Sequence, residues 1–285
     1  TSQFSVITST TLRALTTSQI AAIEIADLNV LTPDSLSVLQ SDQLQALTAT
    51  QIAGLTSQQV YDLNTTVIST LSTKQIAAIE TTDLAVIGVE IFAGFTSAQV
   101  RALNTTQING LTTNQLAGLN SSWVSSLSTT QLRSLEATKL NVLDAVSLAA
   151  ISDAQIVGLT TAQIAGLSNS TVESLSTVAV AALRTTQIAA ITTAQAIALV
   201  DATLTALTSS QIGALTTSAV AILNYDSLAA LLTDQVQALT TAQIAGLTTQ
   251  QVSELTTKAL TALTNQKIVS LETRDIAALS YESLN

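Results

Sequence analysis

The chain has 285 residues and contains no cysteine, histidine or methionine. Without cysteine it can form neither disulfides nor thiolate metal sites. Cysteine content therefore does not indicate whether the protein occupies an oxidising or a reducing compartment. Without histidine and cysteine it also lacks an imidazole base, a thiolate nucleophile and the ligands that soft metals prefer. We therefore expect no catalytic residue, no cofactor and no metal site, and we predict that the chain is not an enzyme.

Charged residues are scarce as well, at 10% of the chain against the usual quarter. Only 9 residues are basic and 19 are acidic, so the net charge is −10 and few phosphates can be neutralised. We expect no nucleic-acid partner. The mean hydropathy is +0.47, but polar residues interrupt every apolar run before the roughly 18 residues of a membrane span. No membrane insertion is expected, and the absence of an initiator Met and of a signal pattern indicates a fragment of a longer protein.

What the sequence does contain is an eight-residue repeat. Every eighth residue from Ile7 to Leu279 is Leu or Ile, or Phe at Phe95, without any insertion or deletion. We number the octad from this residue. Position six is apolar almost as strictly, with Ala196 as the clear exception, and position two is mostly Ser, Thr, Asn or Asp. Position five is Gln in half of the octads.

The octad "LTTAQIAG", found at residues 159–166 and 239–246, shows how these preferences fit together. Thr240 suits a helix N-cap whose hydroxyl accepts from the backbone N–H of Gln243, while the Gln243 side chain accepts from the N–H of Thr240. Leu239, just before the cap, is then placed to pack on Ile244 as a hydrophobic staple. The pattern predicts one helix start in every octad.

Each helix must end before the next cap, after roughly one and a half turns. Pro33 supports this register because it falls at the first helical position, where a missing N–H costs nothing. Most of the nine glycines occupy position eight, next to the helix end, as a C-terminal glycine does. Such short helices persist only when stacked, with positions one and six forming a continuous core and small residues at positions seven and eight allowing close approach. We predict an all-α solenoid, a superhelix with one very short helix per octad.

The alternative is a β-solenoid, since Thr, Ile and Val favour strands. Two features of the octad oppose it. Positions one and six have opposite parity, so one strand cannot point both of them inward. The Gln and Ala content is also typical of helices. The sequence favours the helical solenoid.

A longer period lies above the octad. From Leu15 onward, blocks of seven octads, or 56 residues, resemble one another better than adjacent octads do. We interpret residues 1–285 as one continuous array, with blocks starting near 15, 71 and 127, a truncated block at 183, and further blocks at 207 and 263. Gln is mostly missing from position five of the second, third and seventh octads of a block. The block length has two interpretations. Seven octads could correspond to a whole number of superhelical turns, such as two, or the block could result from sequence duplication and have no geometric meaning.

The best constellation of chemical groups is acidic. The pairs Glu24/Asp27, Glu80/Asp83 and Glu272/Asp275 recur in the second octad of a block, and Glu136/Lys139 is their variant. Paired carboxylates could bind Ca²⁺ weakly or take part in acid–base chemistry. The simpler interpretation is that acids in a first helical turn stabilise the helix dipole. The sequence favours the simpler one, because the copies lie 56 residues apart and one carries Lys.

Four aromatic residues are the candidates for contact with a ligand or partner: Trp123, Tyr61, Tyr225 and Tyr281. Aromatic side chains often anchor interfaces. Trp123 stands at position five, outside the core positions, so partial exposure is one interpretation. The favoured one is that it packs between octads.

Octads such as those in "LTTAQIAGLTTQQVSELTT" resemble the Leu-Thr-Thr-x-Gln-Ile tracts of very large repetitive proteins of Gram-negative bacteria. The resemblance covers the whole chain and implies a secreted or surface-attached, adhesin-like protein. Some proteins with such tracts carry calcium-binding modules elsewhere, but this chain lacks the Gly/Asp-rich nonapeptides of calcium-binding β-rolls. The resemblance supplies no catalytic residues.

These features lead to a structural prediction for function. We expect an elongated spacer or scaffold in an extracellular or bacterial cell-surface protein, whose partners are the flanking domains of the same polypeptide. The alternative is a binding module, in which a solenoid groove recognises a peptide, a glycan or a protein partner.

Overall fold

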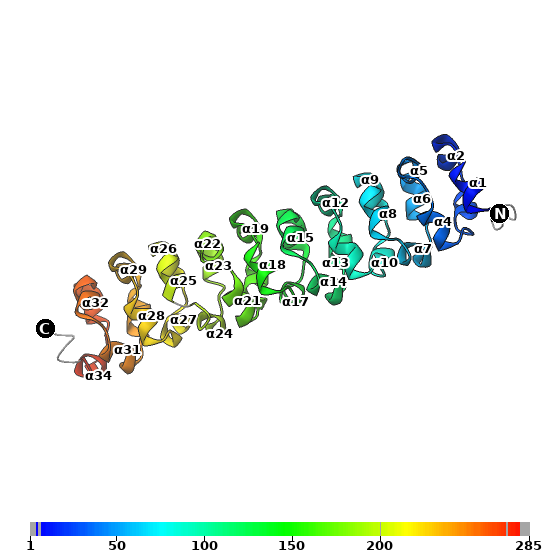
Figure 1. The fold of residues 1–285 in the computed structure, drawn as a ribbon. Helices are drawn as coiled ribbons and strands as arrows, with labels where there is room; N and C mark the ends of the chain where they lie inside the picture. Colours follow the sequence, from blue (N-terminus) through cyan, green and yellow to red (C-terminus); the bar gives the residue numbers. More distant parts are fainter. Residues whose placement is uncertain (1–3, 5–6, 200, 272, 280–285) are drawn as a thin grey trace. The chain divides into compact units, whose positions relative to one another are not determined.

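The architecture comes from a computed structural model that describes residue 4 and residues 7–199, 201–271 and 273–279. Within these residues the chain forms 34 α-helices and no strand (Figure 1). Each helix has four to six residues, and one begins in every octad. The all-α solenoid is therefore confirmed, and the β-solenoid alternative is wrong.

The chain divides into two compact units, Thr1–Ala150 and Ile151–Asn285, and the division falls at the end of an octad. The helices of unit 1 are α1 Ser9–Arg13, α2 Thr17–Ala21, α3 Ile25–Leu28, α4 Pro33–Ser37, α5 Ser41–Ala46, α6 Ala49–Ala53, α7 Ser57–Tyr61, α8 Thr65–Thr70, α9 Thr73–Ala78, α10 Thr81–Leu84, α11 Val89–Ala93, α12 Ser97–Ala102, α13 Thr105–Gly110, α14 Thr113–Ala117, α15 Ser121–Ser126, α16 Thr129–Ser134, α17 Ala137–Leu140 and α18 Ala145–Ala149.

The helices of unit 2 are α19 Asp153–Gly158, α20 Thr161–Gly166, α21 Asn169–Ser174, α22 Thr177–Ala182, α23 Thr185–Ile188, α24 Thr193–Ala196, α25 Asp201–Ala206, α26 Ser209–Ala214, α27 Thr217–Ile222, α28 Tyr225–Ala229, α29 Thr233–Ala238, α30 Thr241–Ala245, α31 Thr249–Ser253, α32 Thr257–Ala262, α33 Asn265–Val269 and α34 Thr273–Ala277.

The helix starts follow the capping chemistry that the octad predicts. The Thr240 hydroxyl accepts from the Gln243 N–H at 3.1 Å, and Gln243 Oε1 accepts from the Thr240 N–H at 2.7 Å. Leu239 and Ile244 are both buried, as the staple requires. Pro33 is the first residue of α4, behind the N-cap Thr32. Each helix thus begins where its own octad specifies.

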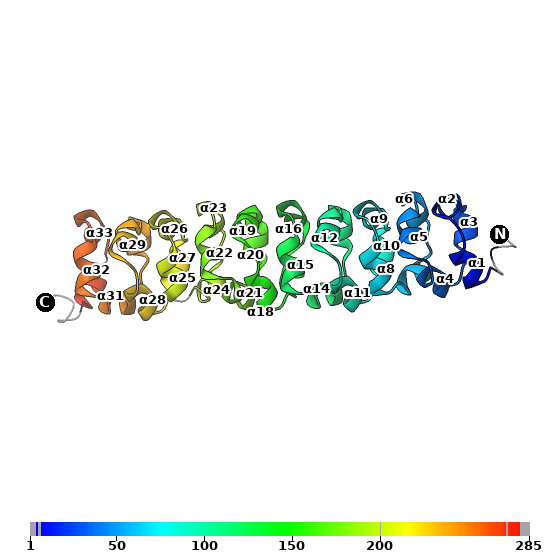
Figure 2. The same ribbon diagram turned by 45° about the horizontal axis from the view of Figure 1, so that its top comes forward.

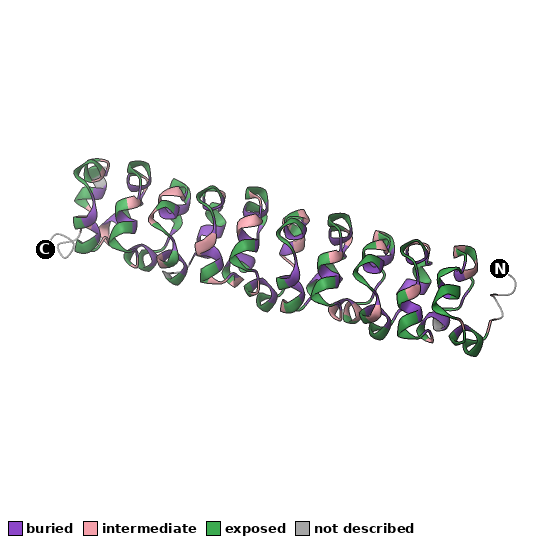
Figure 3. Ribbon diagram, turned by 90° about the horizontal axis from the view of Figure 1, so that it is seen from above, coloured by how far each residue is buried: buried purple, intermediate pink, exposed green. Residues whose placement is uncertain are grey.

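Neighbouring turns of the solenoid are formed by helices that lie three apart in the chain. In unit 1, α9 packs on α12 and α12 on α15, and in unit 2, α26 packs on α29. Figure 2 shows these helices following one another in successive turns within each unit. Residues at positions one and six are buried almost throughout the described residues and form the core, while the outer surfaces of the helices are exposed (Figure 3).

The glycines of position eight lie at helix ends as expected, but they do not adopt the left-handed backbone conformation that glycine often has there. No described residue, glycine included, has a positive φ, so none adopts the left-handed conformation of a C-terminal glycine. Their role is close approach between turns. A Cβ on Gly110 would lie 2.1 Å from Thr81 Cγ2, and one on Gly118 would lie 2.0 Å from Val89 Cγ1. Small residues at this position therefore let the turns pack closely.

Candidate functional site

The glutamine at position five has a second role besides capping its own helix. The Gln131 Oε1 accepts from the N–H of Ser128, the N-cap of α16. Its Nε2 donates to the carbonyl oxygens of Val100 and Leu103, both at 2.7 Å, at the end of α12. The Val100 carbonyl also accepts from the N–H of Leu103, the C-cap residue of α12, at 3.3 Å, and both carbonyls lie at the helix end, where acceptors without an i+4 donor are usual. One buried amide thus caps the start of one helix and the end of another in the preceding turn.

This arrangement, which we name the Gln clip, recurs in both units. In each case Nε2 donates to the backbone carbonyl 28 residues earlier, and in most cases also to the one 31 residues earlier. The residues that form a Gln clip are Gln43, Gln51, Gln59, Gln75, Gln99, Gln107, Gln115 and Gln131 in unit 1 and Gln187, Gln195, Gln211, Gln235, Gln243 and Gln251 in unit 2.

The 28-residue step is one turn of the superhelix and corresponds to three and a half octads. Two such steps make 56 residues, which is the length of the sequence block. Octads at the same place in the blocks from 15, 71 and 127 therefore occupy equivalent places two turns apart where both lie in unit 1. This relation gives the 56-residue block a geometric meaning.

Where position five is not Gln, other groups can reach the same carbonyls. Lys139 Nζ donates to the carbonyl oxygen of Leu111 at 3.1 Å and also to that of Asn109. Ser147 Oγ donates to the carbonyl of Leu119 at 2.9 Å. The contacts with Leu111 and Leu119 again span 28 residues, and the contact with Asn109 spans 30, so the replacements keep a donor in the place of the amide.

The acidic pairs separate into two environments. Asp83 and Asp275, at position five, are buried, and their Oδ1 atoms accept from Ser57 Oγ at 2.6 Å and Thr249 Oγ1 at 2.9 Å. Glu80, at position two, is exposed and makes no side-chain cap hydrogen bond. Only one carboxylate of the Glu80/Asp83 pair thus faces solvent. Among the described residues, no three His, Cys, Asp or Glu side chains gather as a metal site would require.

Trp123 is a core residue, with only 2% of its surface exposed. Its ring lies 5.8 Å from that of Phe92, which in turn stacks on Phe95 at 4.7 Å. The interpretation that Trp123 packs between octads is right, and its candidacy as a contact for a partner is wrong because the ring does not reach the surface. The indole Nε1 has no hydrogen-bond partner in the described structure.

The tyrosines are distributed differently. Tyr61, at the end of α7 in unit 1, is 57% exposed, and Tyr225, at the start of α28 in unit 2, is 43% exposed. Tyr281 lies outside the described residues. Buried Trp123 and exposed Tyr61 therefore form no shared aromatic surface in unit 1.

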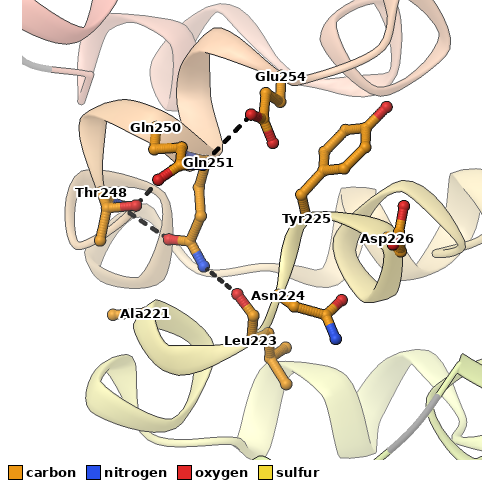
Figure 4. A pocket seen from close by; sticks show the side chains of 9 residues that line it. All are labelled: Ala221, Leu223, Asn224, Tyr225, Asp226, Thr248, Gln250, Gln251 and Glu254. Atoms are coloured by element: carbon orange, nitrogen blue, oxygen red, sulfur yellow. Dashed lines mark hydrogen bonds between the residues drawn. The ribbon is translucent and has the colours of Figure 1, made fainter.

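Tyr225 lines a groove of about 540 Å³ in unit 2 (Figure 4). Its walls are Ala221, Leu223, Asn224, Tyr225, Asp226, Thr248, Gln250, Gln251 and Glu254. Figure 4 shows the ring of Tyr225 beside the groove, with Glu254 reaching in from the end of α31. Gln250 Nε2 donates to Glu254 Oε1 at 3.4 Å. The groove carries two carboxylates and no basic side chain.

One titratable group has a clearly shifted pKa. The backbone N–H of Ser147 donates to Asp144 Oδ1 at 2.7 Å, and this bond lowers the pKa of the Asp144 carboxyl below its usual value of 3.8. The hydroxyl of Ser147 lowers it further. Asp144 is the N-cap of α18, so the shift reflects helix capping.

Among the helices of the described residues, none combines the length and the apolar character that crossing a membrane requires. Comparison with known proteins adds one finding. The ALTTAQ repeat model matches residues 20–57, 76–121 and 220–257. The chain is a repeat protein. No curated protein matches it. The matched stretches include Gln clips of both units, such as those of Gln115 and Gln243.

Proposed function

We propose that this repeat array is a non-catalytic structural region that spaces or scaffolds flanking domains of the same polypeptide. The observation that supports this proposal is the commitment of its polar side chains to the fold. The Thr, Ser and Asn residues at position two cap helices, and Gln at position five holds successive turns together. The apolar residues of positions one and six fill the core.

The setting that we propose is a secreted or surface-attached protein of a Gram-negative bacterium. The basis is the resemblance of the octads to the tracts of large adhesin-like proteins. Mild protease treatment of intact cells that produce the full protein tests this setting. Release of array peptides without lysis is the expected result, and full protection of the array until lysis would contradict it.

A spacer should tolerate changes of length that keep its repeat in phase. Deleting residues 71–126 joins Thr70 to Leu127 and removes one 56-residue block. Gln131 would then stand 28 residues after Leu47, whose carbonyl Gln75 reaches in the intact chain at 2.8 Å. We expect a soluble chain of unchanged helicity per residue and a smaller maximum dimension in solution scattering.

The matched control deletes residues 71–122, which shifts the octads by four residues. This variant should lose helical signal, because core and cap positions no longer align. If the in-phase deletion loses its helicity as the control does, or leaves the maximum dimension unchanged, the spacer proposal is wrong.

The Tyr225 groove favours a second candidate function, recognition of a peptide with a cationic side chain. Tyr225 offers an exposed ring face, and Asp226 and Glu254 offer carboxylates beside it. An arginine-containing peptide titrated against the chain should shift the NMR signals of the Tyr225 ring. The Glu254→Gln variant should weaken binding, whereas Tyr61→Ala, in the other unit, should not. Equal binding by all variants would eliminate this candidate.

A further inference from the structure

The outer surface of unit 2 departs from the repeat at two neighbouring isoleucines. Positions seven and eight of the octad carry mostly small or polar residues, and Ala is the commonest residue at both. Isoleucine occurs at position seven only in Ile197 and at position eight only in Ile222. Both side chains are exposed, Ile197 by 61% and Ile222 by 44%. Ile197 also directly follows Ala196, the residue at which the apolar pattern of position six fails.

The two isoleucines belong to adjacent turns and border one hollow. In unit 1, a side chain at position seven reaches the residue at position eight that follows 25 residues later, as when Arg101 Nε donates to the carbonyl of Ser126. The same step in sequence separates Ile197 from Ile222. They line a hollow of about 50 Å³, and their helices α24 and α27 pack against each other. An apolar side chain that filled this hollow would remove both isoleucines from water.

The hollow adjoins the groove of Tyr225. Leu223 and Asn224 line both of them, so the two depressions meet at these residues. Figure 4 shows both residues in the segment that leads to Tyr225. An occupant that extends across Asn224 therefore meets isoleucine side chains at one end. At the other end it meets the ring of Tyr225 with the carboxylates of Asp226 and Glu254.

Charge decides which occupant suits this surface. The described residues that line the groove include Asp226 and Glu254 but no basic side chain. The chain as a whole has a net charge of −10, so a second copy would bring like charge to these carboxylates. Arginine suits the groove best, because its guanidinium pairs with a carboxylate through two hydrogen bonds and stacks on an aromatic ring. The hollow beside it favours a large apolar residue on the same occupant.

We propose that the Ile197/Ile222 hollow and the Tyr225 groove form one bipartite site for a peptide. A leucine-sized aliphatic side chain occupies the hollow, and an arginine of the same peptide lies beside Tyr225 and Glu254. This inference rests on the recognition of cationic peptides proposed above for the groove, and it adds a second requirement. The apolar anchor restricts binding to peptides whose aliphatic residue lies at a fixed distance from the arginine.

Probe peptides test the second requirement in the full chain. Acetylated and amidated peptides of Gly and Ser carry one arginine, either alone or with one leucine placed one to four residues away. We expect every peptide to shift the NMR signals of the Tyr225 ring. One spacing of leucine should also shift the methyl signals of Ile197 and Ile222 and bind about tenfold more tightly than the peptide without leucine.

The outcomes separate the two proposals for this surface. If Tyr225 shifts but no spacing of leucine raises the affinity or moves the isoleucine methyl signals, the bipartite site is wrong while recognition of a cationic peptide stands. If no peptide shifts Tyr225, recognition by the groove is wrong, and the bipartite site is wrong with it.

A double variant tests the hollow itself. Ile197→Ala with Ile222→Ala restores the residue that most often stands at these positions, so the fold should be kept, as circular dichroism can verify. We expect it to lose the gain from leucine and to bind the leucine-free peptide as the parent does. The matched control is Val178→Ala, also 61% exposed but outside the residues that line the hollow and the groove, which should change neither affinity. Unchanged binding of the leucine peptide by the double variant would overturn the proposal.

Discussion

Gln131 Nε2 donates to the carbonyl oxygen of Leu103 at 2.7 Å across 28 residues of sequence, and its Oε1 accepts from the N–H of Ser128 in its own octad. The amide is used at both ends, as an acceptor within its octad and as a donor to the preceding turn. A carboxylate could supply the first bond but not the second. No octad in the sequence has Glu at position five, although a capping box accepts either residue.

Gln131→Glu should therefore destabilise the array even though the capping box survives. The carboxylate would face the carbonyl oxygens of Val100 and Leu103 while buried, which should cost about 3 kcal/mol or more. The urea midpoint, followed by circular dichroism at neutral pH, measures the loss. Thr130→Glu, an exposed position of the same helix, is the control and should change the midpoint little. Equal midpoints for the two variants would show that the clip contributes nothing.

Gly118→Ala should also be destabilising, because the new Cβ would lie 2.0 Å from Val89 Cγ1. We expect a loss of about 1–3 kcal/mol, as in other overpacked sites. The double variant Gly118→Ala with Val89→Ala removes the opposing methyl groups and should recover most of the loss. Thermal melts of the parent chain, the two single variants and the double variant test this contact. If the double variant lost as much stability as the two single variants together, Gly118 and Val89 would not be in close contact.

Gly88→Ser should stabilise the chain. Gly88 is the N-cap of α11, has an extended backbone (φ −63°, ψ 148°), and supplies no side-chain hydrogen bond to the helix. A Cβ there meets nothing within 4 Å. A serine hydroxyl could accept from the N–H of Ile91, and Ser in place of Gly at an N-cap is worth roughly a few tenths of a kcal/mol. A rise in the urea midpoint is expected, and Gly88→Ala, which adds the Cβ without the hydroxyl, should show no such rise.

Asp144 should make the stability of the array depend on pH in the acid range. Its pKa is lower in the folded chain than 3.8, because the Ser147 N–H donates to the carboxylate. The contribution of Asp144 to the free energy of unfolding is therefore fully present above pH ~4. It is lost as the pH falls through the pKa that Asp144 has in the folded chain. Asp144→Asn keeps the cap but cannot titrate, so its urea midpoint should fall less between pH 6 and pH 3 than that of the parent chain. If the urea midpoints of the two chains fell equally between pH 6 and pH 3, titration of Asp144 would not contribute to the stability.

Trp123→Ala should cost about 3–5 kcal/mol, since a large buried ring would leave a cavity beside Phe92. Trp123→Phe should cost less, because it keeps a ring in the cluster. The chain has one tryptophan, so its fluorescence reports this site directly. We expect blue-shifted emission and slow acrylamide quenching in the folded chain, and rapid quenching would place the ring at the surface instead.

Much of the fold was predictable because the octad encodes it locally. The cap at Thr240, the closing bond from Gln243 and the position of Pro33 at a helix start all follow from chemistry within one octad, and all are present. For the glycines of position eight the sequence predicted two roles, a helix-ending conformation and close approach of neighbouring helices. Only the second is present among the described residues, as Gly118 shows with Val89 of the preceding turn so close to it.

The candidate site was predictable only in part. Trp123 and Tyr225 are equally aromatic in the sequence, yet one lies in the core and the other lines a groove. Their difference depends on what the neighbouring turn places beside them, which is Phe92 for Trp123 and Glu254 for Tyr225. The second bond of each Gln clip also escaped the sequence analysis, although the absence of Glu at position five was a signal for it.

The sequence by itself determined the helices, because caps, boxes and staples act between residues no more than five apart, within reach of a single octad. It also determined which residues are apolar enough to form a core. Only the tertiary structure decided how many octads complete a turn, since that number depends on how helices with small residues at their ends pack against one another. One turn contains three and a half octads, because the Gln131 amide donates to the carbonyl of Leu103, 28 residues earlier in the sequence.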